Sequence, residues 1–301
     1  MKKSFVIIIL AGLMFGTSGI FVNYLSPYGF SPMQMTAMRG LVSALAMVIY
    51  TVIVDRPAFK SRPRELVMYF SCGMMLLMTA TLYYTAIQLT SIATAAVLMY
   101  TAPIFVSIYS AIFLGEKMTP QKIGAIAAML IGCIFVSGVI GSFEADFIGI
   151  LAGLGSGVCY AAYIIISKTA MKDGASPTSL SAYAFIFMSL VALPISNPVE
   201  IVRLASDAWA WVMFILLGLV TFVIPYFLYN TALKSLNAGT ASSLAIIEPM
   251  SATVYAMIIF GEIPDIFGAI GIVLILGSVY LLGYIESRAD AHTEGDSEIS
   301  N

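Results

Sequence analysis

The chain has 301 residues, of which 60% are hydrophobic and 10% are charged, and its formal net charge is −2. These proportions lie outside the range of soluble globular proteins and exclude a large soluble domain. The single histidine, His292, lies near the polar C-terminus, so the apolar part of the chain has no histidine for catalysis or for a metal site.

Apolar runs long enough to cross about 30 Å of hydrocarbon recur along almost the whole chain. They predict an all-α integral membrane protein with ten transmembrane helices. The remaining segment, residues 286–301, is acidic and lacks apolar periodicity, which predicts a disordered tail. The ten predicted helices cover residues 5–25, 32–54, 66–89, 92–114, 120–140, 147–169, 177–196, 208–233, 238–260 and 265–285.

The basic residues predict the orientation of these helices. With ten spans, twelve lysines and arginines fall on the side of the two termini, and only Arg203 falls on the other side. Cytoplasmic loops are enriched in lysine and arginine, so both termini are expected in the cytoplasm and the protein in the plasma membrane.

The second predicted helix begins at Gly29-Phe30-Ser31-Pro32, with Ser31 as its cap and Pro32 in its first turn. Seven residues after Pro32, this helix carries Arg39, about 12 Å deep at 1.5 Å per residue. A guanidinium group binds a carboxylate through two hydrogen bonds, so Arg39 is a candidate anchor for a substrate carboxylate. The alternative is a permanent structural ion pair.

The third and fourth predicted helices contain tyrosines that are candidates for binding the substrate: Tyr83, Tyr84 and Tyr100. Pro103 follows Tyr100 and leaves a carbonyl without its helical donor one turn earlier, which then needs a partner from a side chain, water or solute. Pro103 is therefore a candidate for a helix kink or a gating point, and a purely structural kink is the alternative.

In the eighth predicted helix, Tyr226, Tyr229 and Asn230 share one face at spacings of three and four residues. Aromatic rings that carry hydroxyl groups suit a solute that is partly apolar and partly polar, so these residues are also candidates for binding the substrate. Tyrosines also gather at membrane interfaces, which is the alternative interpretation. Tyr160 and Tyr163 of the sixth helix are weaker candidates.

The ninth predicted helix carries Glu248 directly before Pro249, about 15 Å deep at 1.5 Å per residue. An ionisable group at this depth is costly and is by default a functional candidate. An opening that admits water would favour the ionised carboxylate and closure the neutral acid, so Glu248 is a candidate for proton coupling. It is equally a candidate for binding a substrate ammonium, and the structural alternative is a neutral acid that donates a hydrogen bond. Pro249, like Pro103, is a kink or gating candidate.

Two further carboxylates, Glu116 and Glu262, lie at helix ends shortly before Pro120 and Pro264. A carboxylate near the start of a helix complements the helix dipole. We expect each of them to stabilise the helix that follows it, with gating as the alternative.

The chain contains an internal duplication. Residues 94–116 match residues 240–262 at eight of 23 positions without a gap, and Pro103 coincides with Pro249. The halves are residues 1–143 and 144–285, with five predicted helices each. An odd number of helices per half turns the second half upside down relative to the first, as in the inverted repeats of secondary transporters.

These features together resemble the EamA type of the drug/metabolite transporter superfamily, over about residues 5 to 285. The resemblance rests on the two five-helix halves, the central prolines Pro103 and Pro249, the Gly-Glu ends of the same helices, and Arg39 in the second helix. It implies a single-chain transporter of small organic solutes, often an exporter. One departure is Ala184, which stands where Arg39 would repeat.

We therefore expect a secondary transporter of amino acids, amines or carboxylates that works by alternating access, with export as the expected direction and a proton as a candidate coupling ion. The alternative is an uncoupled facilitator or a channel-like pore. The chain has no Gly-Lys-Ser/Thr phosphate loop, so we expect neither ATP-driven pumping nor an enzyme. We expect no cofactor, metal or nucleic acid; the expected partners are the solute and the lipid bilayer, in a monomer or a homodimer.

Overall fold

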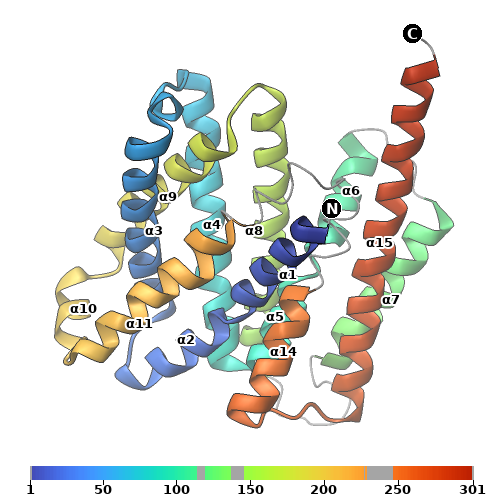
Figure 1. Ribbon diagram of the computed structural model, residues 1–301. Coiled ribbons are helices and arrows are strands. Elements are labelled where there is room, and N and C mark those ends of the chain that lie inside the picture. The colour runs from blue at the N-terminus through green and yellow to red at the C-terminus, as the bar shows by residue number, and fades with distance from the viewer. Residues whose placement is uncertain (1, 114–118, 137–145, 227, 229–246, 300–301) are drawn as a thin grey trace.

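A computed structural model describes residues 2–113, 119–136, 146–226, 228 and 247–299, and within these ranges every regular element is a helix (Figure 1). The all-α prediction is thus confirmed. The first half contains α1 (Lys2–Gly16), α2 (Ser18–Leu25), η1 (Ser26–Tyr28), α3 (Pro32–Val54), η2 (Arg56–Phe59), α4 (Pro63–Leu89), α5 (Ile92–Met99), α6 (Ala102–Phe113) and α7 (Pro120–Val136). The second half contains α8 (Phe147–Lys172), α9 (Pro177–Ile195), α10 (Pro198–Leu204), α11 (Ala208–Gly218), η3 (Leu219–Val223), α14 (Ile247–Phe260) and α15 (Ile266–Ile299).

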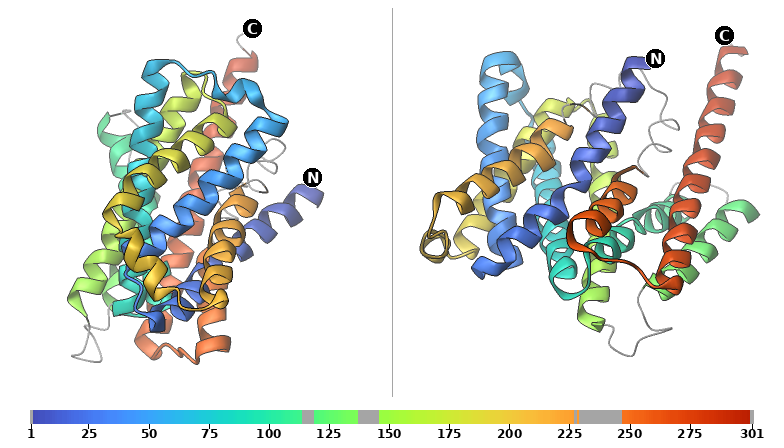
Figure 2. Two further views of the ribbon diagram at one scale, coloured as in Figure 1. Left: turned by 90° about the vertical axis from the view of Figure 1, so that its left-hand side faces the viewer. Right: turned by 60° about the horizontal axis from the view of Figure 1, so that its bottom comes forward.

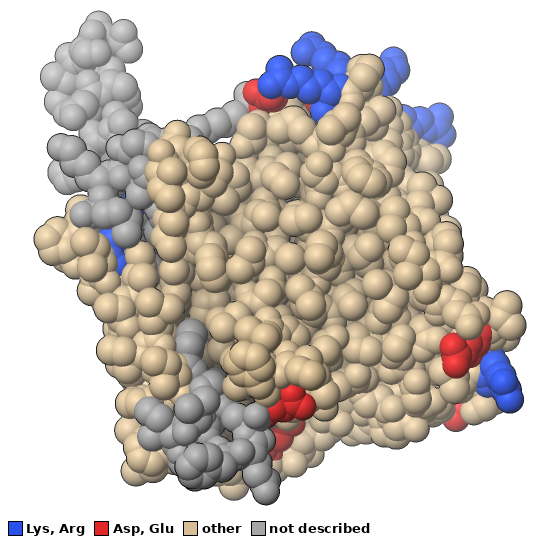
Figure 3. Space-filling model, turned by 180° about the vertical axis from the view of Figure 1, so that it is seen from behind, with Lys and Arg blue, Asp and Glu red and all other residues tan. Residues whose placement is uncertain are grey.

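The surface of the bundle is apolar in its middle. Six of the described helical segments are long and apolar enough to cross a membrane. On α3, the side chains of Leu45, Ile49 and Ile53 are 56%, 59% and 75% exposed. Figure 3 shows a broad uncharged face between ends that carry the lysine, arginine and acidic side chains. Such a surface suits hydrocarbon rather than water.

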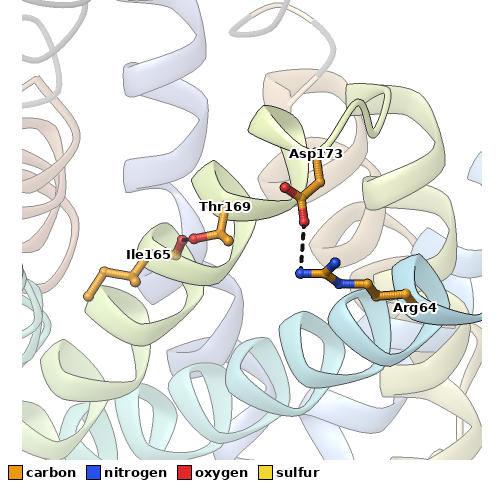
Figure 4. A network of polar contacts seen from close by, with 4 residues as sticks. All are labelled: Arg64, Ile165, Thr169 and Asp173. Carbon is orange, nitrogen blue, oxygen red and sulfur yellow. Dashed lines mark hydrogen bonds and ion pairs between the residues drawn. The ribbon is translucent and has the colours of Figure 1, made fainter. Parts of the chain in front are cut away.

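The two ends of the bundle differ in charge. The connection between α3 and α4, with its basic residues at 56–64, lies at the same end as the C-terminus, whereas α10 with Arg203 lies at the opposite end (Figure 1). We call these the basic end and the α10 end. At the basic end, Arg64 of α4 pairs with Asp173 after α8 at 3.5 Å (Figure 4). Both side chains are exposed, so this pair stabilises the fold little.

The predicted start of the second helix is confirmed in detail, and the seventh helix starts in the same way. Gly29 and Gly174 both have positive φ, 85° and 98°, which side chains other than glycine rarely allow. Ser31 accepts a hydrogen bond from the Gln34 amide at the start of α3. Ser176 accepts one from the Ser179 amide at the start of α9. The same turn therefore begins the corresponding helix in each half.

The two halves pack with a pseudo-two-fold relation. The corresponding helices α3 and α9 lie side by side but run in opposite directions, and α7 lies along its counterpart α15 (Figures 1 and 2). α4 packs on α8 and α9, and its counterpart α11 correspondingly packs on α2 and α3. The inverted repeat predicted from the sequence is thus visible in the helix packing.

Close glycine contacts follow the same symmetry. A Cβ added to Gly73 would lie 2.6 Å from the Ala184 carbonyl oxygen, and one added to Gly218 would lie 3.3 Å from the Arg39 carbonyl oxygen. Gly73 and Gly218 are equivalent at an offset of 145, and so are Arg39 and Ala184. Small residues thus permit the same backbone approach between α3, α4, α9 and α11 in both halves.

The helices differ from the predicted spans at several places. The first span is divided at Thr17, and the fourth is divided at Tyr100 and Thr101 between α5 and α6. The short helix α10 lies in a segment predicted as a loop. The helix α15 continues to Ile299 through the tail predicted to be disordered, because extending an existing helix needs no new nucleus. Each predicted span contains a described helix, and the count of ten remains a prediction.

Candidate functional site

Arg39 lies in the interior of the bundle. Its side chain is 7% exposed, and it projects from the first half of α3. One guanidinium nitrogen, Nη1, donates to the Tyr84 hydroxyl at 2.7 Å, and Nη2 donates to the Thr221 carbonyl at 3.2 Å. Its buried Nε has no hydrogen-bond partner in the described part of the chain. Arg39 therefore retains an unused donor in a buried position.

The segment that faces Arg39 is the π-helical turn η3. Phe222 of this turn lies with its ring 4.0 Å from the guanidinium carbon of Arg39, which is a cation–π contact. The Thr221 hydroxyl donates to the Leu217 carbonyl at 2.5 Å, and the Thr221 carbonyl accepts the hydrogen bond from Arg39. Single π-helical turns occur frequently at functional sites. The ring of Phe222 thus covers the guanidinium in this conformation.

Tyr83 and Tyr84 form the wall of the site on α4. Both are buried, and their ring centres are 5.9 Å apart. Tyr84 accepts the hydrogen bond from Arg39. The guanidinium carbon of Arg39 also lies 5.8 Å from the ring centre of Tyr84, which is within cation–π distance. Both residues were predicted from the sequence to bind the substrate. The structure places them beside Arg39, and their role remains a prediction.

Tyr100 and Glu248 meet across the two halves. Tyr100 stands where the fourth span is divided, and its hydroxyl donates to Glu248 Oε2 at 2.5 Å. Glu248 lies in α14 of the second half, whereas Tyr100 belongs to the first half. The sequence predicts both residues as candidates but does not predict their contact.

The central cluster consists of Arg39, Tyr83, Tyr84, Tyr100 and Glu248. Arg39 and Glu248 interact electrostatically with each other and with Tyr83, but they are not a direct ion pair. Between the described residues, the Arg64–Asp173 contact is the one ion pair. The permanent ion pair that was the structural alternative for Arg39 is therefore not formed with any described residue. The cluster holds one cation and one carboxylate, contributed by opposite halves, with tyrosine hydroxyls between them.

A second aromatic group adjoins the central cluster. Tyr226 contacts the rings of Phe15, Phe185 and Phe222 at centre distances of 5.4, 5.8 and 5.0 Å. It also shares a hydrogen bond with Tyr163 of α8, whose ring stacks on that of Tyr160. Tyr229 and Asn230, the two other candidates of this predicted face, lie outside the described residues.

The two central prolines have different surroundings in the structure. Pro103 lies in the first turn of α6, and the helix is divided just before it rather than only bent. The Met99 carbonyl lies close to Gly157, where an added Cβ would be 3.0 Å away. Pro249 lies in α14, and the residue four positions before it is outside the described part of the chain. The gating role of both prolines remains a prediction.

Glu262 has a different structural role from the one predicted. Its Oε2 accepts a hydrogen bond from the Ile92 amide at 3.0 Å, and the Ala93 amide also donates to the carboxylate. It thus stabilises the start of α5 in the other half rather than the start of α15, because folding brings the end of α14 next to α5. Burial raises the pKa of Glu262, and the two amide hydrogen bonds partly oppose this effect. Glu116 lies outside the described residues.

Thr221 and Phe222 were not predicted from the sequence. A π-helical turn has no sequence signature, and the Thr221 contact uses a backbone carbonyl, which any residue supplies. The one available signal is the spacing of Phe222, four residues before Tyr226, which places both on one helix face.

Comparison with known proteins gives a consistent result. A model described as the EamA-like transporter family matches the chain twice, over residues 2–138 and 147–284. An uncharacterized transporter from Archaeoglobus fulgidus is 29% identical over 275 residues, with 91% of this chain and 94% of the relative covered. The uncharacterized transporter YwfM from Bacillus subtilis is 26% identical, with 89% and 90% covered.

A relative with a stated substrate and a solved structure also match. The threonine/homoserine exporter RhtA of Salmonella typhimurium is 29% identical over 186 residues, which cover 60% of this chain and 59% of RhtA. A protein crystal structure aligns with a TM-score of 0.65 at 16% sequence identity, covering 96% of this chain and 99% of the other. This last likeness concerns the fold alone.

Proposed function

Because the chain belongs to the EamA-like transporter family, we propose that it is a secondary transporter that moves small organic metabolites across the plasma membrane by alternating access. The proposed solutes are amino acids, amines or carboxylates, with export as the direction. Both termini are proposed to be cytoplasmic, from the distribution of basic residues.

The observation that carries this proposal is the state of Arg39. Its guanidinium is buried, and among the described residues its Nε has no hydrogen-bond partner and no carboxylate lies within ion-pair distance. A buried charge without a counter-charge is costly, so this arrangement favours a carboxylate that is supplied by a solute. Glu248 of the opposite half would then face the other end of that solute.

The two charges also favour a zwitterionic solute. Arg39 suits a carboxylate, and Glu248, which Tyr100 holds, suits an ammonium group. An α-amino acid carries both groups within a few bond lengths. The name of the relative RhtA, an exporter of threonine and homoserine, supports the same class. Binding such a solute requires the ring of Phe222 to move from the guanidinium, which the change between two openings of a carrier would provide.

Exchange in proteoliposomes tests this proposal. We expect saturable exchange of amino acids by the purified chain. Replacing Arg39 by lysine substitutes a point charge for the planar guanidinium, so the apparent affinity for the carboxylate-bearing solute is expected to fall roughly tenfold. Arg39→Gln is expected to abolish exchange. The matched control is Arg203→Gln at the α10 end, which should leave exchange unchanged.

The outcomes separate the proposal from its alternatives. A folded Arg39→Gln protein that exchanges amino acids at the rate of the wild type would contradict the role of Arg39. Conductance far above carrier turnover would favour the channel-like pore. Exchange that never responds to a pH gradient would favour the uncoupled facilitator.

A further inference from the structure

A separate cavity opens at the α10 end of the bundle. Its volume is about 680 Å³, and it is distinct from the central cluster, because none of its lining residues belongs to that cluster. It forms where the end of α2, the start of α3 and the end of α4 meet the segment after α14. The lining residues are Asn23, Ser26, Gly29, Phe30, Ser31, Pro32, Ile87, Gln88, Thr90 and Glu262.

The described lining of this cavity carries a negative charge. Among the described residues that line it, Glu262 is the one ionisable residue, and none is a lysine, an arginine or a histidine. The carboxylate is fixed in position, since its Oε2 accepts the Ile92 amide at 3.0 Å. The Ala93 amide also donates to this carboxylate, so two backbone amides orient it at the edge of the cavity.

The neutral polar groups of the cavity offer further acceptors. Gln88 donates through Nε2 to Ser26 Oγ at 3.1 Å and to the Phe30 carbonyl at 3.3 Å, which leaves its own amide oxygen as an acceptor. Asn23 also lines the cavity, and its side-chain amide has an oxygen that can accept a hydrogen bond. A carboxylate surrounded by amide oxygens is an environment for a cation that can donate several hydrogen bonds.

The cavity continues the line of the central cluster along α4. Ile87 and Gln88 lie one helical turn beyond Tyr83 and Tyr84, on the same face of the helix. Tyr83 interacts electrostatically with both Glu248 and Glu262. A solute that leaves the central cluster along α4 would therefore next meet this cavity.

We propose that this cavity is a second binding site of the transporter, which takes the ammonium group of an organic solute between Glu262 and the amide oxygens of Asn23 and Gln88. Its volume of about 680 Å³ is far larger than an inorganic ion requires, because one water molecule occupies about 30 Å³ of liquid. The inference rests on the proposed transport function and extends it, since the solute would bind at this second site after it leaves the central cluster along α4. Binding of the ammonium group in this cavity can be measured without measuring transport.

Protection of a reporter cysteine tests the site in the purified full-length chain. Thr90 lines the cavity, and its hydroxyl bonds only to backbone carbonyls of its own helix end, so Thr90→Cys is a mild reporter substitution. The rate of maleimide labelling is measured with ethanolammonium chloride, with the neutral ethylene glycol of similar size, and with sodium chloride. The wild-type chain gives the background from its native cysteines.

We expect ethanolammonium to slow the labelling of Thr90→Cys, and we expect neither ethylene glycol nor sodium to do so at equal concentration. In Thr90→Cys/Glu262→Gln, protection should weaken roughly tenfold or more, because a charge-assisted hydrogen bond is lost while the amide oxygen still accepts the Ile92 amide. In Thr90→Cys/Asn23→Asp, a second carboxylate should strengthen protection several-fold. The Asn23→Asp protein keeps the test decisive if Glu262→Gln does not fold.

The proposal would be overturned by equal protection by ethylene glycol or by sodium, by unchanged protection in Glu262→Gln, or by unchanged protection in Asn23→Asp. Loss of protection in Thr90→Cys/Arg39→Gln would show that the reporter senses only the central cluster, which also overturns it. Persisting protection in that variant supports a separate site, even if exchange experiments contradict the transport function proposed above.

Discussion

At the scale of single residues, the chain places one cation and one carboxylate where neither has a partner of opposite charge within ion-pair distance in the described structure. Arg39, Glu248 and the tyrosines were predicted as candidates because ionisable and hydroxyl-bearing side chains inside an apolar helix are conspicuous. The contact of Tyr100 with Glu248 was not predictable, because it depends on how two distant segments pack. The Thr221 carbonyl was not predictable either, because backbone groups are present at every residue.

The first prediction at this scale concerns Glu248. Glu248→Gln keeps the size of the side chain and an oxygen that accepts the Tyr100 hydroxyl, but it removes titration. We expect the variant to fold and to lose transport driven by a pH gradient, while solute exchange without a gradient partly survives. The measurement is uptake into proteoliposomes with and without an imposed pH difference.

The control for this experiment is Tyr100→Phe, which removes the hydrogen bond and leaves the carboxyl group titratable. Proton-driven accumulation by Glu248→Gln at the wild-type level would exclude Glu248 as the coupling site. Loss of exchange together with loss of solute binding would favour direct binding of a substrate ammonium.

The second prediction concerns the pH dependence of Glu262. Burial raises its pKa above the ordinary value of 4.5, so folding disfavours the ionised form. The contribution of Glu262 to stability is then fully present below pH 4.5 and is lost as the pH rises through the raised pKa. The melting temperature of the wild type minus that of Glu262→Gln should therefore fall as the pH rises. A difference that grows with pH would contradict this assignment.

At the scale of helices, the predictable features are those that a few adjacent residues determine. The Gly-x-Ser-Pro turns are an example: Gly29 and Gly174 have positive φ, and Ser31 and Ser176 cap the helices that follow. The division between α5 and α6 and the π-helical turn η3 were not predicted. Hydropathy is uniform across both places, and a helix in a membrane departs from regular geometry only where packing satisfies the freed backbone groups.

The prediction at this scale concerns the glycines of α1 that face α14. A Cβ added to Gly16 would lie 2.0 Å from Ser251 Oγ and 3.0 Å from both the Ala252 amide and the Glu248 carbonyl. The serine side chain can rotate, but the backbone atoms cannot move without separating α1 from α14. We expect Gly16→Ala to destabilise the protein by about 1–3 kcal/mol, as overpacking usually does, measured as a lower melting temperature in detergent.

Gly277→Ala in α15 is the matched control. No atom lies within 4 Å of a Cβ at that position, so the substitution meets open space and gains the helix propensity of alanine, about 1 kcal/mol. Equal melting temperatures for Gly16→Ala and Gly277→Ala would show that the approach of α1 to α14 does not limit stability.

At the scale of the whole molecule, the duplication explains both the symmetry and the site. Equivalent glycines make equivalent contacts: Gly12 lies against Ile247, and Gly157 lies against Thr101, the counterpart of Ile247 at an offset of 146. On this symmetric frame the charged groups are asymmetric. Arg39 has Ala184 as its counterpart, and Glu248 has Ala102. The one arginine and the one glutamate of the central cluster therefore come from opposite halves, and transporters with inverted repeats bind their substrates at the interface of the halves.

The last prediction concerns the orientation of the whole chain. The α10 end carries Arg203, whereas the connection between α3 and α4 at the basic end carries Lys60 and other cations. Cytoplasmic loops retain positive charge, so we expect the basic end in the cytoplasm. In intact cells, an impermeant thiol reagent should label Arg203→Cys and spare Lys60→Cys. Both should react after permeabilisation, and the wild-type chain corrects for native cysteines. Labelling of Lys60→Cys alone in intact cells would reverse the orientation, and the cavity at Glu262 would then open to the cytoplasm and meet the solute before the central cluster does during export.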